Sequence, residues 1–329
     1  MNSIASTPLV TVVLATYNQQ EYVQNALESI MTQTYKNLEI IVCDNGSTDN
    51  TKAIIRSFVS KFPNIVFLDY KTNKNITIRH NHYINIANGE FVSILFGDDY
   101  YLPKKIEKQV ETFLKLDQSW GVVYGPTMIE HQSNNKLVKE MGLQKSGYVL
   151  SALLNNWHNG GIMNCVVPLT RTQCYKKYLN YEDIFTEGEG VFLRIAIDYK
   201  FYYHNEPLAV MTEHENNYGK SVISNIKNHD KVLSRMQSMC VLTKDTKDLI
   251  RSHRSVGLLN ASWHCIRTNV NAEESRSILM LAIKIYPLIL LKLKLSLGII
   301  LTLLPLSVLK ILNKIVDILF EKKPFVIAE

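Results

Sequence analysis

Two apolar runs within the first hundred residues each end directly in acidic side chains. In EIIVCDNGSTDNT the apolar run ends at Asp44, and in FVSILFGDDYYLP the apolar run is followed by the neighbouring carboxylates Asp98 and Asp99. Carboxylate oxygens are the ligands that hard divalent cations prefer, and a bound cation can neutralise a charged leaving group. An aspartate at a strand end can also accept hydrogen bonds from N–H groups. The two acidic strand ends therefore predict a site for a divalent cation and a polar ligand.

The segments around these residues alternate between buried strands and amphipathic helices. The predicted strands are Leu9–Leu14, Leu38–Cys43, Ile65–Leu68 and Phe91–Phe96. Between the first two, QEYVQNALESIMTQTY places apolar residues at helical spacing. This alternation predicts an α/β fold with a mostly parallel sheet flanked by helices. Ligands bind at the carboxyl ends of such strands, so the acidic residues are expected on one rim of the sheet.

Composition and cysteine usage narrow the class of protein. The chain has 329 residues, of which 20% are charged and 46% hydrophobic, as in a folded globular protein. Its five cysteines form no C-x-x-C pair, which favours free thiols in a reducing compartment. No basic segment precedes the first apolar run, so we expect no signal peptide and a cytoplasmic location.

The C-terminal segment has a different character from the rest of the chain. Residues 277–323 are dense in leucine, isoleucine and lysine, and their longest uncharged stretch, Leu295–Leu309, has 15 residues. This is shorter than the roughly 20 residues needed to span a bilayer. The pattern predicts helices that lie on the inner face of the cytoplasmic membrane. A helical hairpin packed on the domain and a homodimer contact remain alternatives.

Several motifs in the first half of the chain resemble one known family. TVVLATYNQQEYVQNALESIMTQTYKNLEIIVCDNGSTDNT is similar to the opening of family-2 glycosyltransferases, strand–PTYN–helix–S-x-x-x-Q-T-y–strand–DDGSTD-x-T. IANGEFVSILFGDDYYLPKKIEKQ resembles that family's A-x-G-E-y-i-x-f-l-D-x-D-D-x-x-x-P-x-K-l-E. The match is dense over the first hundred residues, thinner to about residue 220, and absent from the tail. It implies a GT-A fold and the inverting transfer of a hexose or N-acetylhexosamine from a nucleotide-diphosphate sugar, with UDP favoured.

The resemblance implies a set of nucleotide-binding residues. They are Thr16, Tyr17, Asn18, Asp44, Arg79 and Asp98. Asp44 occupies the position that accepts a ring N–H of the base, and Tyr17 is placed to pack against the base. The family's R-N-x-g segment has His80 in place of its arginine, and the adjacent Arg79 is the substitute candidate.

The resemblance also implies a metal site for Mn²⁺ or Mg²⁺. Its candidate ligands are Asp98, Asp99 and His214. Asp98 matches the last carboxylate of the family's D-x-D, but Phe96 replaces the first. His214 lies in Thr212-Glu213-His214-Glu215-Asn216, which resembles the family's r-x-H-x-n.

A general base is required to deprotonate the acceptor hydroxyl as it attacks the anomeric carbon. The family supplies this base from E-D-x-x-L-x-L-R, and the corresponding segment here is EGEGVFLR. Gly188 stands where the family has its aspartate, so Glu187 and Glu189 are the catalytic candidates.

These assignments divide the chain into three parts. Residues 1–125 are expected to bind the nucleotide sugar, 126–225 the acceptor, and 226–329 to form a helical region with the membrane-surface segment. The implied partners are the donor, a lipid-linked or oligosaccharide acceptor and the membrane surface. Nucleic acid is not expected as a partner, because the basic residues cluster with leucines and not with exposed aromatics.

Two other functions compete with catalysis. Phe96 and Gly188 are the substitutions expected of a scaffold protein that kept the fold and lost the chemistry, whereas intact Asp44, Asp98 and Asp99 argue against it. A sugar-nucleotide nucleotidyltransferase would have a glycine-rich basic loop after the first strand. LATYNQQEY is not such a loop.

Overall fold

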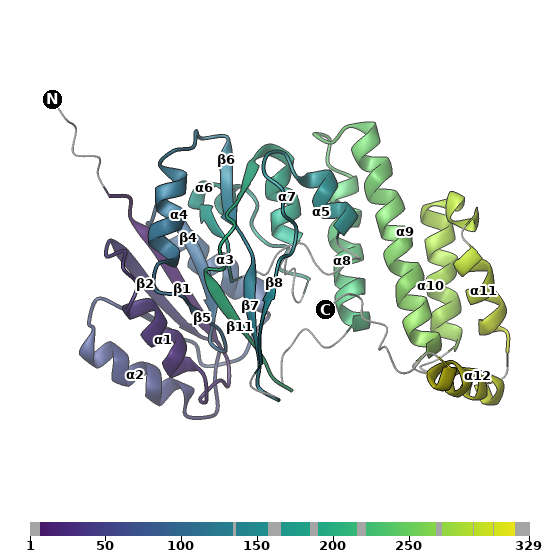
Figure 1. The fold of residues 1–329 in the computed structure, drawn as a ribbon, viewed down its shortest axis with the longest axis horizontal. Coiled ribbons are helices and arrows are strands. Elements are labelled where there is room, and N and C mark those ends of the chain that lie inside the picture. Colours follow the sequence, from purple (N-terminus) through teal and green to yellow (C-terminus); the bar gives the residue numbers. More distant parts are fainter. Residues whose placement is uncertain are drawn as a thin grey trace. The chain divides into compact units, whose positions relative to one another are not determined.

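The computed structural model divides the chain into two compact units (Figure 1). It describes residues 7–133, 136–156, 166–184, 190–215, 222–267, 272–291, 293–304 and 306–319. The first unit comprises Met1–Ala152 and Ile162–Asn217, and the second comprises Leu153–Gly161 and Tyr218–Glu329. Of the predicted donor and acceptor parts, residues 1–152 and 162–217 fall in the first unit, and residues 153–161 and 218–225 fall in the second.

The first unit is built on a seven-stranded sheet with strand order β10-β6-β9-β4-β1-β2-β3. Its strands are β1 (Val10–Thr16), β2 (Leu38–Asp44), β3 (Val66–Asp69), β4 (Phe91–Phe96), β6 (Trp120–Tyr124), β9 (Leu169–Arg171) and β10 (Lys200–Tyr203). β1 pairs in parallel with both β2 and β4, and β2 pairs in parallel with β3. β9 runs antiparallel between β4 and β6. The predicted mostly parallel sheet is confirmed.

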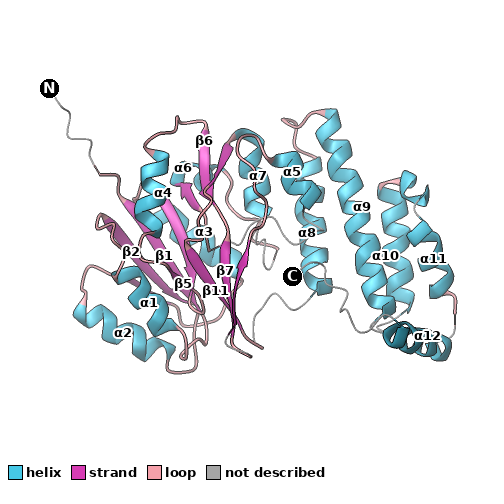
Figure 2. Cartoon of the chain, viewed as in Figure 1, coloured by secondary structure: helices cyan, strands magenta, loops and turns pink. Residues whose placement is uncertain are grey.

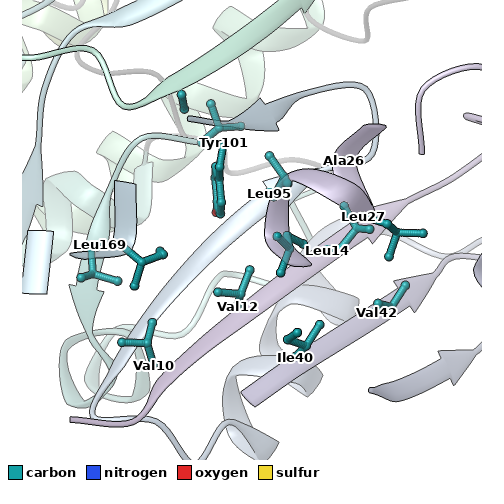
Figure 3. Close-up of a cluster of buried hydrophobic side chains, with 14 of the residues drawn as sticks. Val10, Val12, Leu14, Ala26, Leu27, Ile40, Val42, Leu95, Tyr101 and Leu169 are labelled. Carbon is teal, nitrogen blue, oxygen red and sulfur yellow. The ribbon is translucent and has the colours of Figure 1, made fainter. Parts of the chain in front are cut away.

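Helices cover this sheet and close its core (Figure 2). They are α1 (Val23–Met31), α2 (Thr51–Lys61), α3 (Ile76–Ile86), α4 (Lys105–Phe113), α6 (Thr172–Lys177) and α7 (Gly190–Asp198), whereas α5 (Leu150–Asn156) has residues in both units. All seven residues of β1 are buried, as expected for a central parallel strand covered on both faces. Alternate residues Val10, Val12 and Leu14 share one core with Leu27 of α1 and Val42 of β2 (Figure 3). This apolar packing fixes the strand ends that carry the polar residues.

A smaller sheet, with strand order β5-β11-β7-β8, completes the first unit. Its strands are β5 (Tyr100–Tyr101), β7 (Thr127–His131), β8 (Lys136–Glu140) and β11 (Ala209–Glu213). β11 runs antiparallel to β5, with Val210 opposite Tyr100. The chain after β11 therefore returns to the turn that connects β4 with β5.

The second unit is helical. It contains α8 (Val222–Gln237), α9 (Lys244–Arg267), α10 (Ala272–Ile285), the 3₁₀ helix η2 (Pro287–Leu291), α11 (Leu293–Thr302) and α12 (Leu306–Leu319). Small side chains bring α9 and α10 together, because the Oγ atoms of Ser262 and Ser275 lie 2.6 Å apart and are both buried. None of the helices described combines the length and apolar character needed to cross a bilayer.

Candidate active site

Asp44 organises the turn at the end of β2. Its side chain is fully buried, and its Oδ2 atom accepts hydrogen bonds from the backbone N–H groups of Gly46 (3.0 Å) and Ser47 (2.9 Å). Lys52 Nζ lies 3.5 Å from the same oxygen. The other oxygen, Oδ1, is buried and has no hydrogen-bond partner among the described residues. A buried acceptor without a partner is costly, so this oxygen is suited to an N–H donor from a ligand.

The backbone of this turn permits the geometry. Gly46 has a φ of +89°, in the left-handed region that favours glycine. A Cβ at this position would lie 2.6 Å from the backbone nitrogen of Asn73. The turn after β2 is therefore held against the segment that follows β3.

The loop after β1 interlocks with the turn after β2. In the parallel register Thr16 lies opposite Asp44. Asn18, at a φ of +51°, donates its backbone N–H to Ser47 Oγ (2.9 Å) and accepts from Thr48 N (2.8 Å) through Oδ1. The Tyr17 side chain is 40% exposed beside them. The predicted nucleotide-binding residues of these two loops thus form one surface.

The Arg79 side chain makes hydrogen bonds within the protein beside this surface. On α3 it is buried, and its Nε donates to Asn45 Oδ1 (2.8 Å) while a terminal nitrogen donates to the Thr72 carbonyl (2.8 Å). Its guanidinium lies 3.4 Å from the centroid of the Tyr70 ring. Burial and the nearby Arg194 lower the pKa of the neighbouring His80 to about 3, so His80 is neutral near pH 7. Of Arg79 and His80, Arg79 is therefore the residue that supplies the positive charge of this segment.

The second acidic strand end meets His214. Asp98 lies in the turn after β4, and its Oδ2 is 3.2 Å from Nε2 of His214, which follows β11. The Tyr22 ring stacks on the imidazole with centroids 4.8 Å apart and planes inclined by 13°. Tyr22 in turn donates its hydroxyl to Gln132 Oε1 (2.9 Å). A chain of contacts therefore links Asp98 through His214 and Tyr22 to Gln132, which lie in four distant segments of the sequence.

Asp99 takes a different role from its neighbour. It is buried, and its Oδ1 accepts the backbone N–H of Thr212 in β11 at 2.9 Å. Burial and the charge of Asp98 raise the pKa of Asp99 well above its usual range. The bond to Thr212 ties β11 to the β4–β5 turn, and this holds His214 against Asp98.

The arrangement can be tested for its fit to a divalent cation. Among the described residues no group of three or more His, Cys, Asp and Glu side chains has the geometry of a metal site. Asp98 and His214 do offer one carboxylate and one imidazole, with their nearest atoms 3.2 Å apart. Two such ligands suit one cation that takes its remaining ligands from phosphate oxygens and water. The fit is thus to a cation shared with a phosphorylated ligand.

Comparison with known proteins decides the family. The sequence profile of Glycosyl transferase family 2 matches residues 11–163. An uncharacterised glycosyltransferase of Methanocaldococcus jannaschii is 32% identical over 202 residues, which cover 59% of this chain and 67% of that protein. The chain belongs to glycosyl transferase family 2. An uncharacterised glycosyltransferase of Rickettsia typhi is 38% identical over 129 residues, 39% of each chain, so this chain matches only about two fifths of that relative's length.

Solved structures share the fold of this family-2 protein. S. aureus TarS 1-349 in complex with UDP superposes with a TM-score of 0.62 at 16% identity, covering 85% of this chain and 81% of TarS. The mannosyltransferase PcManGT from Pyrobaculum calidifontis, in complex with GDP-Man and Mn²⁺, gives a TM-score of 0.57 at 15% identity, covering 97% and 89%. The GT-A-like α/β fold with C-terminal helices expected from the sequence is confirmed.

The catalytic-base candidates of this family-2 protein lie outside the described residues. Glu187 and Glu189 fall between Ile184 and the start of α7 at Gly190. Within α7, Arg194 donates to the carbonyl oxygen of Leu179 at 2.8 Å. The motif's arginine therefore anchors the chain just before that segment, and the choice of base stays a prediction.

Two contributors were missed by sequence reasoning. Tyr22 reads as an ordinary apolar residue at a helix start, and nothing local indicates its stack on His214. Lys105 is fully buried, and its Nζ donates to Ser93 Oγ (2.8 Å) and Gln109 Oε1 (2.9 Å), joining β4 to α4. Burial lowers the pKa of this lysine well below its usual range. Lys105 matches the lysine of the family motif P-x-K-l-E, and this match could have indicated that it has a role.

The Tyr22 stack makes a testable prediction about this family-2 protein. Tyr22→Ala removes the ring that holds the His214 imidazole beside Asp98, so we expect donor turnover to fall about tenfold, in line with the ~0.5–1.5 kcal/mol of an aromatic pair. Tyr22→Phe keeps the stack and loses only the bond to Gln132, so its turnover should stay within about threefold of wild type. Steady-state release of nucleoside diphosphate measures both variants. Equal losses in the two would show that the hydroxyl, and not the ring, matters.

Proposed function

We propose that this chain is an inverting glycosyltransferase that moves a sugar from a UDP-sugar to a hydroxyl of a lipid-linked or growing glycan. The observation that carries the proposal is the buried Oδ1 of Asp44, an acceptor with no partner among the described residues, beside the interlocked loops of Tyr17 and Asn18. The Asp98–His214 pair lies in the same unit. Asp44 would accept a hydrogen bond from the base, and the Asp98–His214 pair would hold a cation beside the diphosphate.

The hydrogen bonds of Asp44 favour uracil. Oδ2 is already occupied by the N–H groups of Gly46 and Ser47 and by the nearby Lys52, which leaves Oδ1 for the ligand. Uracil presents a single ring N–H between two carbonyl groups. Guanine presents two adjacent donors, N1–H and the N2 amino group, which pair best with both oxygens of a carboxylate. One free oxygen therefore suits the uracil edge.

The reaction needs charge neutralisation at the diphosphate. A divalent cation held by Asp98 and His214 supplies this to the leaving group when it is bound. The imidazole favours Mn²⁺ over Mg²⁺, since Mg²⁺ prefers oxygen ligands throughout. Asp99 and Tyr22 then hold the two ligands in position through Thr212 and the stacked ring.

The transfer itself is a single displacement. The acceptor oxygen forms a bond to the anomeric carbon while the bond from that carbon to the phosphate oxygen breaks, and UDP leaves with the electron pair. The proton of the acceptor hydroxyl passes to a carboxylate, for which Glu187 and Glu189 are our candidates. Attack from the face opposite the diphosphate inverts the anomeric configuration.

A scaffold protein without catalysis is the second candidate. Phe96 favours it, because this residue stands in place of a metal-binding aspartate and packs against the hydrophobic core. A scaffold gains nothing from a costly buried acceptor at Asp44, however, unless it also binds a nucleotide. Turnover separates the two functions.

Calorimetric titration with UDP, GDP and TDP, each with and without Mn²⁺, tests the proposal. We expect UDP to bind at least tenfold more tightly than GDP, because guanine leaves one of its donors unpaired in this site, and Mn²⁺ to strengthen the binding of UDP. UDP-GlcNAc is the first donor to assay for turnover, since a TarS structure holds it. Tighter binding of GDP would overturn the base assignment. Binding of UDP without turnover of any UDP-sugar would support the scaffold.

A further inference from the structure

The last helix of the second unit, α12, is strongly amphipathic. At 3.6 residues per turn, Lys310, Asn313 and Lys314 lie along one side of the helix. Val308, Ile311 and Leu312 lie on the opposite side. An amphipathic helix of a globular protein normally packs its apolar side against the core and exposes its polar side.

The described side chains of α12 depart from this expectation in two ways. Asn313 is 8% exposed, and its Nδ2 donates to the carbonyl oxygen of Ile266 in α9 at 2.8 Å. By contrast, Ile311 is 60% exposed, and Val308 and Leu312 are 38% and 37% exposed. Asn313 therefore lies against α9, whereas the apolar side chains of Val308, Ile311 and Leu312 are exposed.

Apolar side chains between residues 280 and 303, in the part of the chain that precedes α12, are exposed as well. They are Met280, Leu281, Leu288, Leu290, Leu291, Ile300 and Leu303. Of the sixteen large apolar side chains that are exposed among the described residues, ten lie within residues 280–312. Such a concentration of exposed apolar side chains in one segment favours an interaction site.

The charge of the segment identifies what covers it. Residues 275–316 contain no Asp or Glu but include Arg276 and five lysines. Lys284, Lys310 and Lys314 are exposed. A second copy of this segment would bring like charges together, whereas the headgroups of anionic lipids carry the complementary charge. A 14-residue helix is too short to span a bilayer but sufficient to lie in its interface.

We propose that α12 docks on the surface of an anionic lipid bilayer. Val308, Ile311 and Leu312 enter the boundary between headgroups and acyl chains, and Lys310 and Lys314 remain at the level of the headgroups, where long basic side chains extend toward water. The docking does not depend on the donor chemistry, and it places the enzyme where lipid-linked acceptors reside.

Flotation of the full-length protein with phosphatidylcholine vesicles, with and without phosphatidylglycerol, tests this proposal. We expect binding only when phosphatidylglycerol is present. Ile311→Asp should abolish flotation, while Val241→Asp is a matched control because Val241 is exposed to a similar degree (59%) on the same unit. Replacing Lys310 and Lys314 together by glutamine should weaken binding about thirtyfold. Replacing the α9 lysines Lys244 and Lys247 by glutamine is the control for charge.

The outcomes of this experiment are distinct. Equal binding to vesicles without phosphatidylglycerol, or full flotation of Ile311→Asp, would overturn the proposal. A dimer in light scattering that Ile311→Asp dissociates, with no flotation of the wild type, would assign the face to a second copy instead. UDP binding, measured on the same variants, is expected to stay unchanged. A wild type that floats without binding UDP would refute the proposed function and leave the membrane surface intact.

Discussion

Replacement of Asp98 by asparagine is expected to lower donor turnover by at least a hundredfold. The substitution keeps the size of the side chain but removes the negative charge that faces the His214 imidazole at 3.2 Å. Phe96 stands in place of one carboxylate of this motif, and Asp99 is buried and accepts the backbone N–H of Thr212, so Asp98 is the carboxylate that faces His214. Loss of a group that stabilises transition-state charge typically costs ~10²–10³ in kcat.

Release of UDP from UDP-GlcNAc, measured over a range of Mn²⁺ concentrations, is the readout for this variant. The matched control is Asp117→Asn. Asp117 accepts the backbone N–H of Ser119 at 2.7 Å and precedes β6 instead of following a strand of the parallel core. We expect the control to keep wild-type turnover and both proteins to melt as cooperatively as wild type. Full turnover by Asp98→Asn at saturating donor would remove Asp98 from the metal site.

The first half of the fold was predictable because its strands and helices follow from patterns of neighbouring residues. β1 is buried along its whole length and β2 over its last five residues, and the apolar runs of both predict covered parallel strands. Once the strands are parallel, their carboxyl ends share a rim, and Thr16 and Asp44 are opposite each other in the register. The nucleotide-binding surface follows from periodicity and one topological rule.

The rest of the site depends on pairing between segments far apart in the sequence. Nothing near Tyr100 indicates that it pairs with Val210, and this pairing brings His214 to Asp98. The motif around His214 suggested its role, but the stack of Tyr22 depends on the packed unit as a whole. Short strands such as β5 and β9 carry too few residues for a period to be read.

The C-terminal segment shows a similar division between what composition reveals and what packing decides. Its density of leucine and lysine distinguished it from the rest of the chain. On α12 the polar Asn313 is buried and bonded to the carbonyl of Ile266, while the apolar Ile311 is exposed. An amphipathic pattern defines two faces, but it does not state which one the protein buries.

The second large effect is expected at the base. Asp44→Asn should weaken UDP binding about ten- to a hundredfold, since a hydrogen bond to a charged group contributes ~1.5–3 kcal/mol. The oxygen of the introduced amide can still accept the N–H groups of Gly46 and Ser47 that Asp44 Oδ2 now accepts. Its amino group would then occupy the place of Oδ1 and confront the ring N–H of uracil, donor against donor.

This geometry predicts a change of preference as well as a loss. Cytosine carries an unprotonated N3 where uracil carries N3–H, so the introduced amino group can donate to it. Calorimetry of Asp44→Asn with UDP and CDP should therefore show the UDP:CDP affinity ratio fall well below that of the wild type, whereas Asp117→Asn should leave the ratio unchanged. The strengthening of UDP binding by Mn²⁺ should persist, because Asp98 and His214 are untouched.

A uniform loss of affinity for both nucleotides would mean that Asp44 supports only its own turn. An unaltered affinity for UDP would place the base elsewhere. Only a shifted ratio identifies Asp44 as the residue that reads the base.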